Sequence, residues 1–356
     1  MGINWQPDHL GDGFALTELH VGSDEEGPCL ATLVSYTPPA VVSPTGLRDA
    51  ARVALNRLRP CGRDEQESAV QAVLYVHGWS DYFFQHELAH FFSDRGIAFY
   101  ALDLRKYGRS LRPWQTPGYV TNLSEYDDDI AAALDTLSED ITAKTGAPPS
   151  GITLMAHSTG ALVASLWANR FPGRVSSLIL NSPWLDIQGS AILRTTTQGL
   201  LEPITRFRPK ARLKLPEFGF YWRSISNLAE GEWELNGQWR PQFGFPIRAG
   251  WLTAVLNGHA QVRRGLSIDL PVLVLSSARS TISPVWSEAM LSSDSVLDVT
   301  VMTQRALQLG PHVTVCRYDG ALHDTLLSRT AVRRKVYADL DRWVRCYSSA
   351  SPIPEI

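Results

Sequence analysis

The stretch from Ile152 to Trp167 constrains this chain most, because it places a serine where a strand turns into a helix. It reads I-T-L-M-A-H-S-T-G-A-L-V-A-S-L-W. The apolar run ending at Ala156 predicts a buried strand, and apolar residues at helical spacing after Thr159 predict a helix. Ser158 then occupies the turn, where a strained backbone lifts the hydroxyl clear of the sheet edge. We therefore expect Ser158 to be a nucleophile.

The residues on either side of Ser158 are small for a physical reason. Ala156 and Gly160 stand two positions before and after it, where a larger side chain would collide with the closely approaching strand and helix. The pattern is G-x-S-x-G with alanine in place of the first glycine. A surface serine in an ordinary loop is the alternative, and the flanking strand and helix disfavour it.

Length and charge limit the class of protein. A chain of 356 residues, 44% of them hydrophobic, suits one large α/β domain with an inserted piece, or two domains. With 33 basic and 36 acidic residues the net charge is only −3, which indicates no nucleic-acid partner. We expect a small molecule as the partner, and the sequence leaves the oligomeric state open.

The amino terminus and the cysteines favour a cytoplasmic protein. The first residues, M-G-I-N-W-Q-P-D-H-L, form neither a basic nor an apolar signal region. No run reaches the roughly 18 apolar residues of a membrane span, so we expect no stable membrane insertion. The four cysteines are far apart and form no CxxC pair, which disfavours zinc ribbons and redox motifs and fits a reduced compartment.

Buried strands alternate with helices along most of the chain, which predicts a largely parallel sheet with helices on both faces. The expected strands are an antiparallel hairpin at one edge of the sheet (Phe14 to Val21 and Cys29 to Tyr36), then Ala72 to Val76, Ile97 to Leu102, the run ending at Ala156, Val175 to Leu180, Val272 to Leu275 and Val313 to Arg317. Expected helices are Ser124 to Lys144, the segment after Thr159, Met302 to Leu309 and Ala331 to Tyr347, with a surface insertion at Pro38 to Ser68 that includes a short helix at Ala50 to Leu58.

The strand and helix alternation lapses between Ile187 and about Gly250, where the chain is aromatic and basic. We interpret this segment as a cap inserted into the core, which divides the chain into residues 1–186, 187–250 and 251–356. Dense aromatics favour an apolar ligand. Packing within the cap's own small core is the alternative for any single tryptophan.

A glycine loop and a histidine supply the other parts of a serine site. His77-Gly78-Trp79-Ser80 leaves a predicted strand, and glycine there lets the following N–H turn toward a reacting carbonyl. A plain turn is the alternative. His323 follows the last predicted strand, where its loop reaches the same sheet edge as Ser158, so it is the candidate base among nine histidines.

The base needs a buried carboxylate to hold its tautomer, and no acid directly follows the strand at Val272 to Leu275. The first carboxylates after that strand and before His323 are Glu288, Asp294 and Asp298. The chain order serine, aspartate, histidine is that of α/β-hydrolases.

With these motifs the chain resembles the α/β-hydrolases of the serine aminopeptidase-like group, which includes monoacylglycerol lipases and lysophospholipases. The resemblance covers nearly the whole chain and implies an α/β-hydrolase fold with Ser158 as nucleophile and His323 as base. It implies an oxyanion hole of the Trp79 and Thr159 N–H groups. Asp294-Ser-Val-Leu-Asp-Val299 is similar to the stretch that carries the family's acid. That match favours Asp294, 29 positions before His323, with Asp298 as runner-up.

One rival motif indicates a different enzyme. His86-Glu87-Leu88-Ala89-His90 matches H-E-x-x-H, the zinc-metallopeptidase signature. Its extended form requires glycine at position 93 and histidine at 96, where this chain has Ser93 and Gly96. We therefore expect this segment to be a helix covering the sheet and not a metal site.

The function that these residues predict is hydrolysis of a carboxylic ester through a Ser-His-Asp triad and an acyl-enzyme, with no cofactor and no metal. An apolar acyl group, as in a lysophospholipase or monoacylglycerol lipase, fits the aromatic cap. An amidase or iminopeptidase on the same triad remains open. A non-catalytic binding module and a zinc metallopeptidase are the alternatives from other classes.

Overall fold

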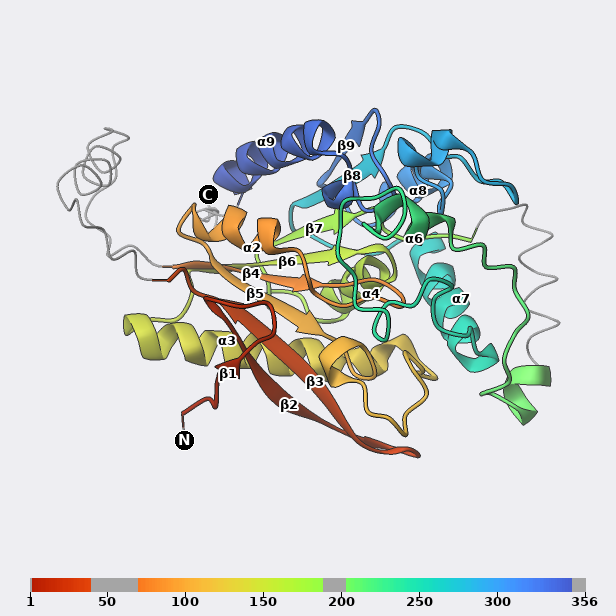
Figure 1. Ribbon diagram of the computed structural model, residues 1–356. Helices are drawn as coiled ribbons and strands as arrows, with labels where there is room; N and C mark the ends of the chain where they lie inside the picture. Colours follow the sequence, from red (N-terminus) through yellow and green to blue (C-terminus); the bar gives the residue numbers. More distant parts are fainter. Residues whose placement is uncertain (1, 40–69, 188–202, 348–356) are drawn as a thin grey trace.

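The computed structural model describes residues 2–39, 70–187 and 203–347, and within them the chain forms one nine-stranded sheet (Figure 1). Its strands are β1 (Gln6–Pro7), β2 (Phe14–Asp24), β3 (Gly27–Tyr36), β4 (Gln71–Val76), β5 (Ala98–Asp103), β6 (Gly151–His157), β7 (Ser177–Asn181), β8 (Val272–Ser277) and β9 (Val313–Tyr318). Their spatial order is β1-β2-β3-β5-β4-β6-β7-β8-β9. From β5 to β9 neighbouring strands are parallel, which confirms the expected α/β class.

The predicted hairpin lies at one end of the sheet and is longer than expected. β2 and β3 pair antiparallel as far as Asp24 opposite Gly27, so only Glu25 and Glu26 form the turn. The two-residue strand β1 pairs antiparallel outside β2 and takes the edge position. β3 pairs antiparallel with β5 and joins this hairpin to the parallel strands.

Helices cover both faces of the sheet. They are α2 (His86–Ser93), α3 (Asp127–Thr145), α4 (Ser158–Arg170), α6 (Phe220–Ile225), α7 (Ala249–Arg263), α8 (Val299–Ala306) and α9 (Thr330–Tyr347), with short 3-10 turns at Gly108–Ser110, Leu123–Tyr126, Glu288–Leu291 and Thr325–Leu327. Figure 1 shows α2 and α9 on one side of the sheet and α3 on the other. This layering buries β4 to β8 on both faces, whereas the edge strand β9 stays partly exposed.

The two faces of the sheet carry two separate cores, because successive side chains of a strand point to opposite sides. In β4, Leu74 and Val76 join the core beneath α3, α4 and α7, whereas Val73 and Tyr75 join the core beneath α2 and α9. Both cores exclude water from the central strands β4 to β8. The carboxyl ends of the parallel strands therefore form a rigid edge from which loops can present polar side chains.

The predicted helices are present with small shifts that local capping explains. The helix expected at Met302 to Leu309 begins at Val299, because the Asp298 carboxylate accepts hydrogen bonds from two N–H groups of its first turn. The long helix expected from Ser124 begins at Asp127, after a 3-10 turn that Asn122 and Glu125 cap reciprocally. The short helix expected at Ala50 to Leu58 lies outside the described residues.

Between 203 and 247 the chain has little regular structure, in line with the lapse in its sequence pattern. α6 lies within this segment, and α7 follows it and packs against α4. Residues 188–202 of the expected cap lie outside the described residues. The division of the chain at 187 and 250 stays a prediction.

Candidate active site

Ser158 occupies a strained turn between β6 and α4. β6 ends at His157 and α4 begins at Ser158, so no loop separates strand from helix. The φ angle of Ser158 is +50°, a conformation that non-glycine residues seldom adopt and that costs on the order of 1–3 kcal/mol. The hydroxyl is thereby presented at the carboxyl edge of the sheet, as the sequence pattern predicts.

Glycine is required at two points around this turn. A Cβ on Gly160 would lie 2.1 Å from the carbonyl oxygen of His77, which no side-chain carbon can tolerate. A Cβ on Gly78 would lie 3.1 Å from the Cβ of Ser158. The loop after β4 and the turn before α4 therefore approach each other closely only because both glycines lack side chains.

A chain of hydrogen bonds joins Ser158, His323 and Asp294. His323 Nε2 lies 2.9 Å from Ser158 Oγ, and His323 Nδ1 lies 2.9 Å from Asp294 Oδ2. A carboxylate oxygen only accepts, so Nδ1 carries the proton and Nε2 accepts from the serine hydroxyl. All three side chains are buried, and Asp294 is fully so. The arrangement is one in which an imidazole can take the hydroxyl proton while a carboxylate stabilises the resulting imidazolium.

The structure distinguishes the three acids that the sequence left open. After β8 the chain leaves the sheet and returns, and the N–H of Asp294 then donates to the Arg279 carbonyl at 2.9 Å. The second oxygen of Asp294, Oδ1, accepts from two backbone N–H groups, each at 2.8 Å, which fixes the carboxylate toward His323. Asp298 instead caps α8, and Glu288 is exposed.

The loop at Gly78 and Trp79 stands beside the serine, held by a buried histidine. His77 Nε2 accepts from the Leu104 N–H at 3.1 Å, so its Nδ1 carries the proton that the Gly78 carbonyl accepts at 2.8 Å. Thr159 lies in the first turn of α4, where N–H groups have no intrahelical partner. Its N–H and that of Trp79 are the backbone donors that the sequence predicts for an oxyanion.

A cavity of about 150 Å³ opens onto Ser158 and His323. Its apolar lining includes Trp79, Tyr221, Trp222 and Val296, and its polar lining includes Asp81 and Arg240. Burial lowers the pKa of the cavity-lining His157 and keeps this ring neutral near pH 7. Its ring lies 4.9 Å from that of His323 without adding a positive charge beside it.

The segment that covers this cavity is anchored to the core by buried polar contacts. Arg240 Nη1 contacts Asp81 Oδ1 at 2.5 Å, and both side chains are buried. The Phe245 N–H donates to Ser80 Oγ at 3.0 Å, and the Tyr221 hydroxyl accepts from the Asp324 N–H at 3.2 Å. These contacts hold the segment against the loop after β4 and against the loop that carries His323.

Sequence reasoning missed several of the residues that support the site. Asn181 at the end of β7 donates to Asp324 at 2.5 Å, and its oxygen accepts from Thr325, which holds the loop that carries His323. A polar residue ending a buried strand was the available signal. The pairing of Asp81 with Arg240 had no signal, since these residues are 159 positions apart.

The H-E-x-x-H segment forms α2, as predicted, and its side chains are engaged elsewhere. The rings of His86 and His90 pack on Phe14 at 5.3 and 6.3 Å. Glu87 pairs with Arg333 at 2.8 Å. Within residues 2–39, 70–187 and 203–347, no group of three or more histidine, cysteine, aspartate or glutamate side chains is arranged to hold a metal ion.

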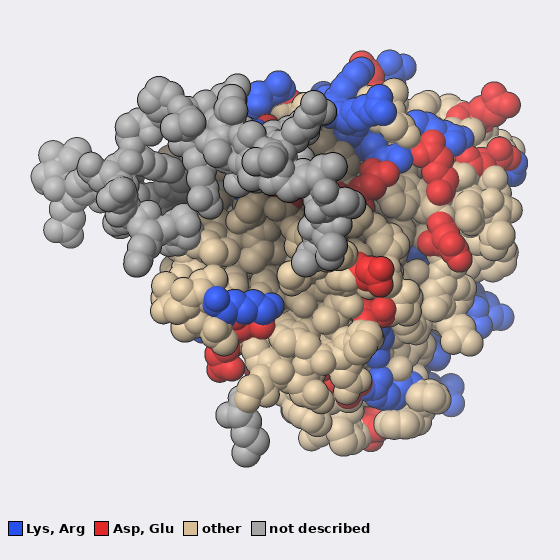
Figure 2. Space-filling view, turned by 60° about the vertical axis from the view of Figure 1, so that its left-hand side comes forward, with Lys and Arg blue, Asp and Glu red and all other residues tan. Residues whose placement is uncertain are grey.

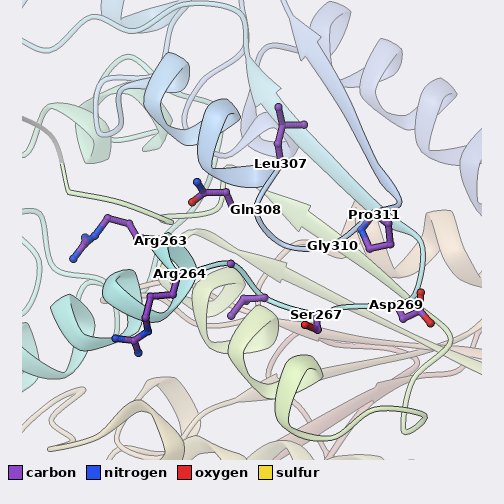
Figure 3. A pocket seen from close by; sticks show the side chains of 10 residues that line it. Arg263, Arg264, Ser267, Asp269, Leu307, Gln308, Gly310 and Pro311 are labelled. Carbon is purple, nitrogen blue, oxygen red and sulfur yellow. The ribbon is translucent and has the colours of Figure 1, made fainter.

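A second hollow, of about 690 Å³, lies at the other end of the sheet (Figure 3). Its lining residues Ser267 and Asp269 precede β8, and Pro311 precedes β9. These are the amino ends of parallel strands, whereas Ser158 and His323 follow the carboxyl ends. The hollow is therefore separate from the cavity at Ser158.

Residues 67–329 match the family described as Serine aminopeptidase, S33, which covers well over half of the sequence and includes Ser158, Asp294 and His323. The chain belongs to this family. The S33 assignment makes the protein a serine hydrolase with the α/β-hydrolase fold, as the sequence motifs predict.

Relatives of this S33 member include lipases. A monoacylglycerol lipase of Mycolicibacterium smegmatis is 27% identical over 230 residues, which cover 62% of this chain and 73% of that protein. Among solved structures, a Saccharomyces cerevisiae monoglyceride lipase has a TM-score of 0.59 at 14% identity, with 98% of this chain and 96% of that chain covered. A Paleococcus ferrophilus monoacylglycerol lipase has a TM-score of 0.55 at 16% identity, covering 78% and 96%. At such identities the structural likeness shows the fold alone.

In the described parts of the S33 chain, no helix combines the length and the apolar character that crossing a bilayer demands.

Proposed function

We propose that this serine hydrolase cleaves carboxylic esters of an apolar acyl group, with Ser158 as nucleophile, His323 as base and Asp294 as the acid. The continuous hydrogen-bonded chain from Ser158 Oγ through His323 to Asp294 Oδ2, with both contacts at 2.9 Å beside an open cavity, carries the proposal. The 27% identity to a monoacylglycerol lipase supports an ester substrate in place of an amide.

In the proposed cycle, His323 accepts a proton and then donates one in each of two half-reactions, acylation and deacylation. His323 Nε2 takes the proton of Ser158 as Oγ attacks the ester carbonyl, and the carbonyl oxygen becomes an oxyanion that the Trp79 and Thr159 N–H groups stabilise. His323 then passes the proton to the departing alcohol, which leaves Ser158 acylated. Water attacks the acyl-enzyme, giving its proton to His323, and Ser158 regains a proton as the free acid departs. The Asp294 carboxylate orients the imidazole and stabilises the imidazolium in both half-reactions.

The shape of the cavity supports an apolar acyl chain of modest length. Three aromatic side chains and Val296 line the cavity beside Ser158, and Asp81 and Arg240 add a buried ion pair to the lining. A volume of about 150 Å³ holds a group about the size of benzene, which corresponds to about six carbons of an acyl chain. We infer that the acyl group packs against these aromatic side chains.

Replacing the nucleophile tests the proposal. Ser158→Ala should abolish both the hydrolysis of a short p-nitrophenyl ester and covalent labelling by a fluorophosphonate probe, because no other group lies within bonding distance of His323 Nε2 in the described site. Chelators should leave the wild-type rate unchanged. The zinc motif at His86 and His90 would be favoured if activity survived Ser158→Ala and disappeared with a chelator. A binding module would be favoured if the wild type neither reacted with the probe nor hydrolysed any ester.

A further inference from the structure

A surface segment beside the cavity, residues 203–218, combines exposed basic and exposed apolar side chains. It contains five basic residues and one acidic residue, Glu217, although the whole chain has more acidic than basic residues. The basic side chains alternate with apolar ones through much of the segment, R-F-R-P-K-A-R-L-K-L. In Figure 1 this part of the chain lies at the right-hand edge of the molecule, beyond α7.

Four of the five basic side chains have no acidic partner among the described residues. Arg206, Arg208, Arg212 and Lys214 are exposed and form no ion pair within the part of the chain that the structure describes. Lys210, by contrast, pairs with Glu25 and Glu26 at 2.7 Å and ties the segment to the turn between β2 and β3. Elsewhere charges of both signs are interspersed, as on the face that Figure 2 shows.

The apolar side chains of the segment are unusually exposed. Phe207 is 78% and Leu215 49% accessible, and Phe218 is 45% accessible. Exposed phenylalanine and leucine in a contiguous stretch mark an interaction surface, because water contact with such groups is unfavourable. Free basic residues interleaved with them fit the interface of an anionic lipid surface, where charges meet headgroups and the rings enter the acyl boundary.

Backbone contacts hold the segment in this orientation. The Leu213 N–H donates to the Ile247 carbonyl at 2.9 Å, and the Ala249 N–H donates to the Ala211 carbonyl at 3.0 Å. Leu213 consequently packs against the core, and its neighbours Arg212 and Lys214 face outward. The cations are thus displayed by a fixed backbone.

The same surface continues to the mouth of the catalytic cavity. Glu217 and Val296 line that cavity, and Val296 is itself exposed. Phe218 follows Glu217 directly, and the exposed Phe243 stands between the cavity-lining Gln242 and Gly244. A lipid surface that contacts residues 203–218 would therefore lie against the entrance through which an apolar ester reaches Ser158.

We propose that residues 203–218 dock this enzyme peripherally on anionic lipid surfaces, with the cavity mouth turned toward the lipid. The net charge of −3 repels an anionic surface as a whole, so the local excess of cations also selects the orientation of approach. The proposal rests on the proposed function only for the apolar ester as substrate; the docking itself rests on charge and exposure.

Sedimentation with lipid vesicles tests the docking. The full chain should bind vesicles of roughly one part phosphatidylserine to two parts phosphatidylcholine, bind phosphatidylcholine alone far more weakly, and be released by high salt. The variant Arg206→Gln/Arg208→Gln/Arg212→Gln/Lys214→Gln should lose about 100-fold or more in partition into the anionic vesicles. The matched control, Arg264→Gln/Arg334→Gln/Lys335→Gln/Arg342→Gln, removes the same number of exposed charges elsewhere and should bind nearly as the wild type does.

Further measurements separate docking from catalysis and from other polyanions. Hydrolysis of a water-soluble p-nitrophenyl ester without vesicles should be unchanged in both charge variants, and its failure in the wild type would count against the proposed function alone. Phe207→Ser/Leu215→Ser should weaken vesicle binding about tenfold. The docking proposal would be overturned by equal binding to neutral and anionic vesicles, or by an equal loss of binding in the control variant. It would also be overturned if the protein bound DNA as tightly as vesicles and the Phe207 and Leu215 changes left that binding unaltered.

Discussion

Two aspartates four positions apart have different environments, and the hydrogen bonds that each accepts explain why. Asp294 turns one oxygen to His323 and the other to two backbone N–H groups, so it is held in one orientation inside the protein. Asp298 accepts from the Thr300 and Val301 N–H groups at the start of α8. A carboxylate in that position stabilises the helix and does not face the imidazole.

This difference predicts the outcome of replacing each aspartate. Asp294→Asn should lower kcat on the order of 10²–10⁴-fold, because an amide permits the wrong histidine tautomer, while the melting temperature changes by a few degrees at most. Asp298→Asn should leave kcat nearly unchanged, since asparagine caps a helix about as well as aspartate. Both variants would be assayed side by side by ester turnover and thermal unfolding. A large rate loss in Asp298→Asn with a near-normal Asp294→Asn would exchange the two assignments.

At the scale of elements, the irregular chain between 203 and 247 covers the cavity at Ser158, and the carboxyl edge of the sheet carries the candidate catalytic residues. Its contacts with the core converge on the loop after β4, through Asp81 and Ser80, and on the loop that carries His323. The segment 203–247 therefore limits the size of the cavity, whereas the residues at the sheet edge carry the chemistry. We expect changes in this segment to alter substrate preference.

The size of the cavity leads to a prediction about acyl chains. Turnover of p-nitrophenyl esters, compared as kcat/KM, should rise from acetate to about hexanoate, because each added methylene buries apolar surface against the aromatic wall. Beyond about six carbons the rise should stop, since a volume of about 150 Å³ is then filled. Aminoacyl p-nitroanilides would be measured in parallel. A profile that falls from acetate, or faster cleavage of the anilides, would contradict the apolar acyl assignment and favour the peptidase alternative.

For the whole molecule, the packing of α7 against α4 buries a histidine that is not part of the proposed triad. His259 of α7 is completely inaccessible, and its Nε2–H donates to the Trp184 carbonyl at 2.9 Å. Its Nδ1 has no hydrogen-bond partner among the described residues. A second proton would therefore be buried without an acceptor, and burial lowers the pKa of His259 from 6.5 to about 4.

This buried histidine makes stability depend on pH in a defined window. Below pH 6.5 the unfolded chain gains a proton at His259 that the folded protein takes up only near pH 4, so the free energy of unfolding falls as the pH drops between these values. The contribution of this one group is about 3 kcal/mol over the window. His259→Gln should flatten the slope of denaturant-derived stability between pH 6.5 and 4. The exposed His20→Gln serves as control and should retain the wild-type slope; equal slopes in wild type and His259→Gln would contradict the prediction.

The sequence by itself determined those features that depend on neighbouring residues. The strand, turn and helix around Ser158 follow from an apolar run, small residues on either side and helical spacing, all within about 16 positions. The parallel strands were predicted because buried strands alternate with helices along the chain. His323 was predicted because the carboxyl ends of parallel strands meet at one edge, so the loop after the last strand had to lie near Ser158.

Tertiary structure alone decided what depends on residues far apart in the chain. Asp294 could be favoured only by resemblance, because the chain makes an excursion after β8 whose return point no local pattern specifies. The ion pair of Asp81 and Arg240 joins the loop after β4 to the segment that covers the cavity. No local sequence pattern predicts the pairing of charges this far apart in the chain. The two histidines of α2 match a metal motif in sequence, yet the packing of the helix against β2 and β3 gives their rings Phe14 and Tyr36 as neighbours.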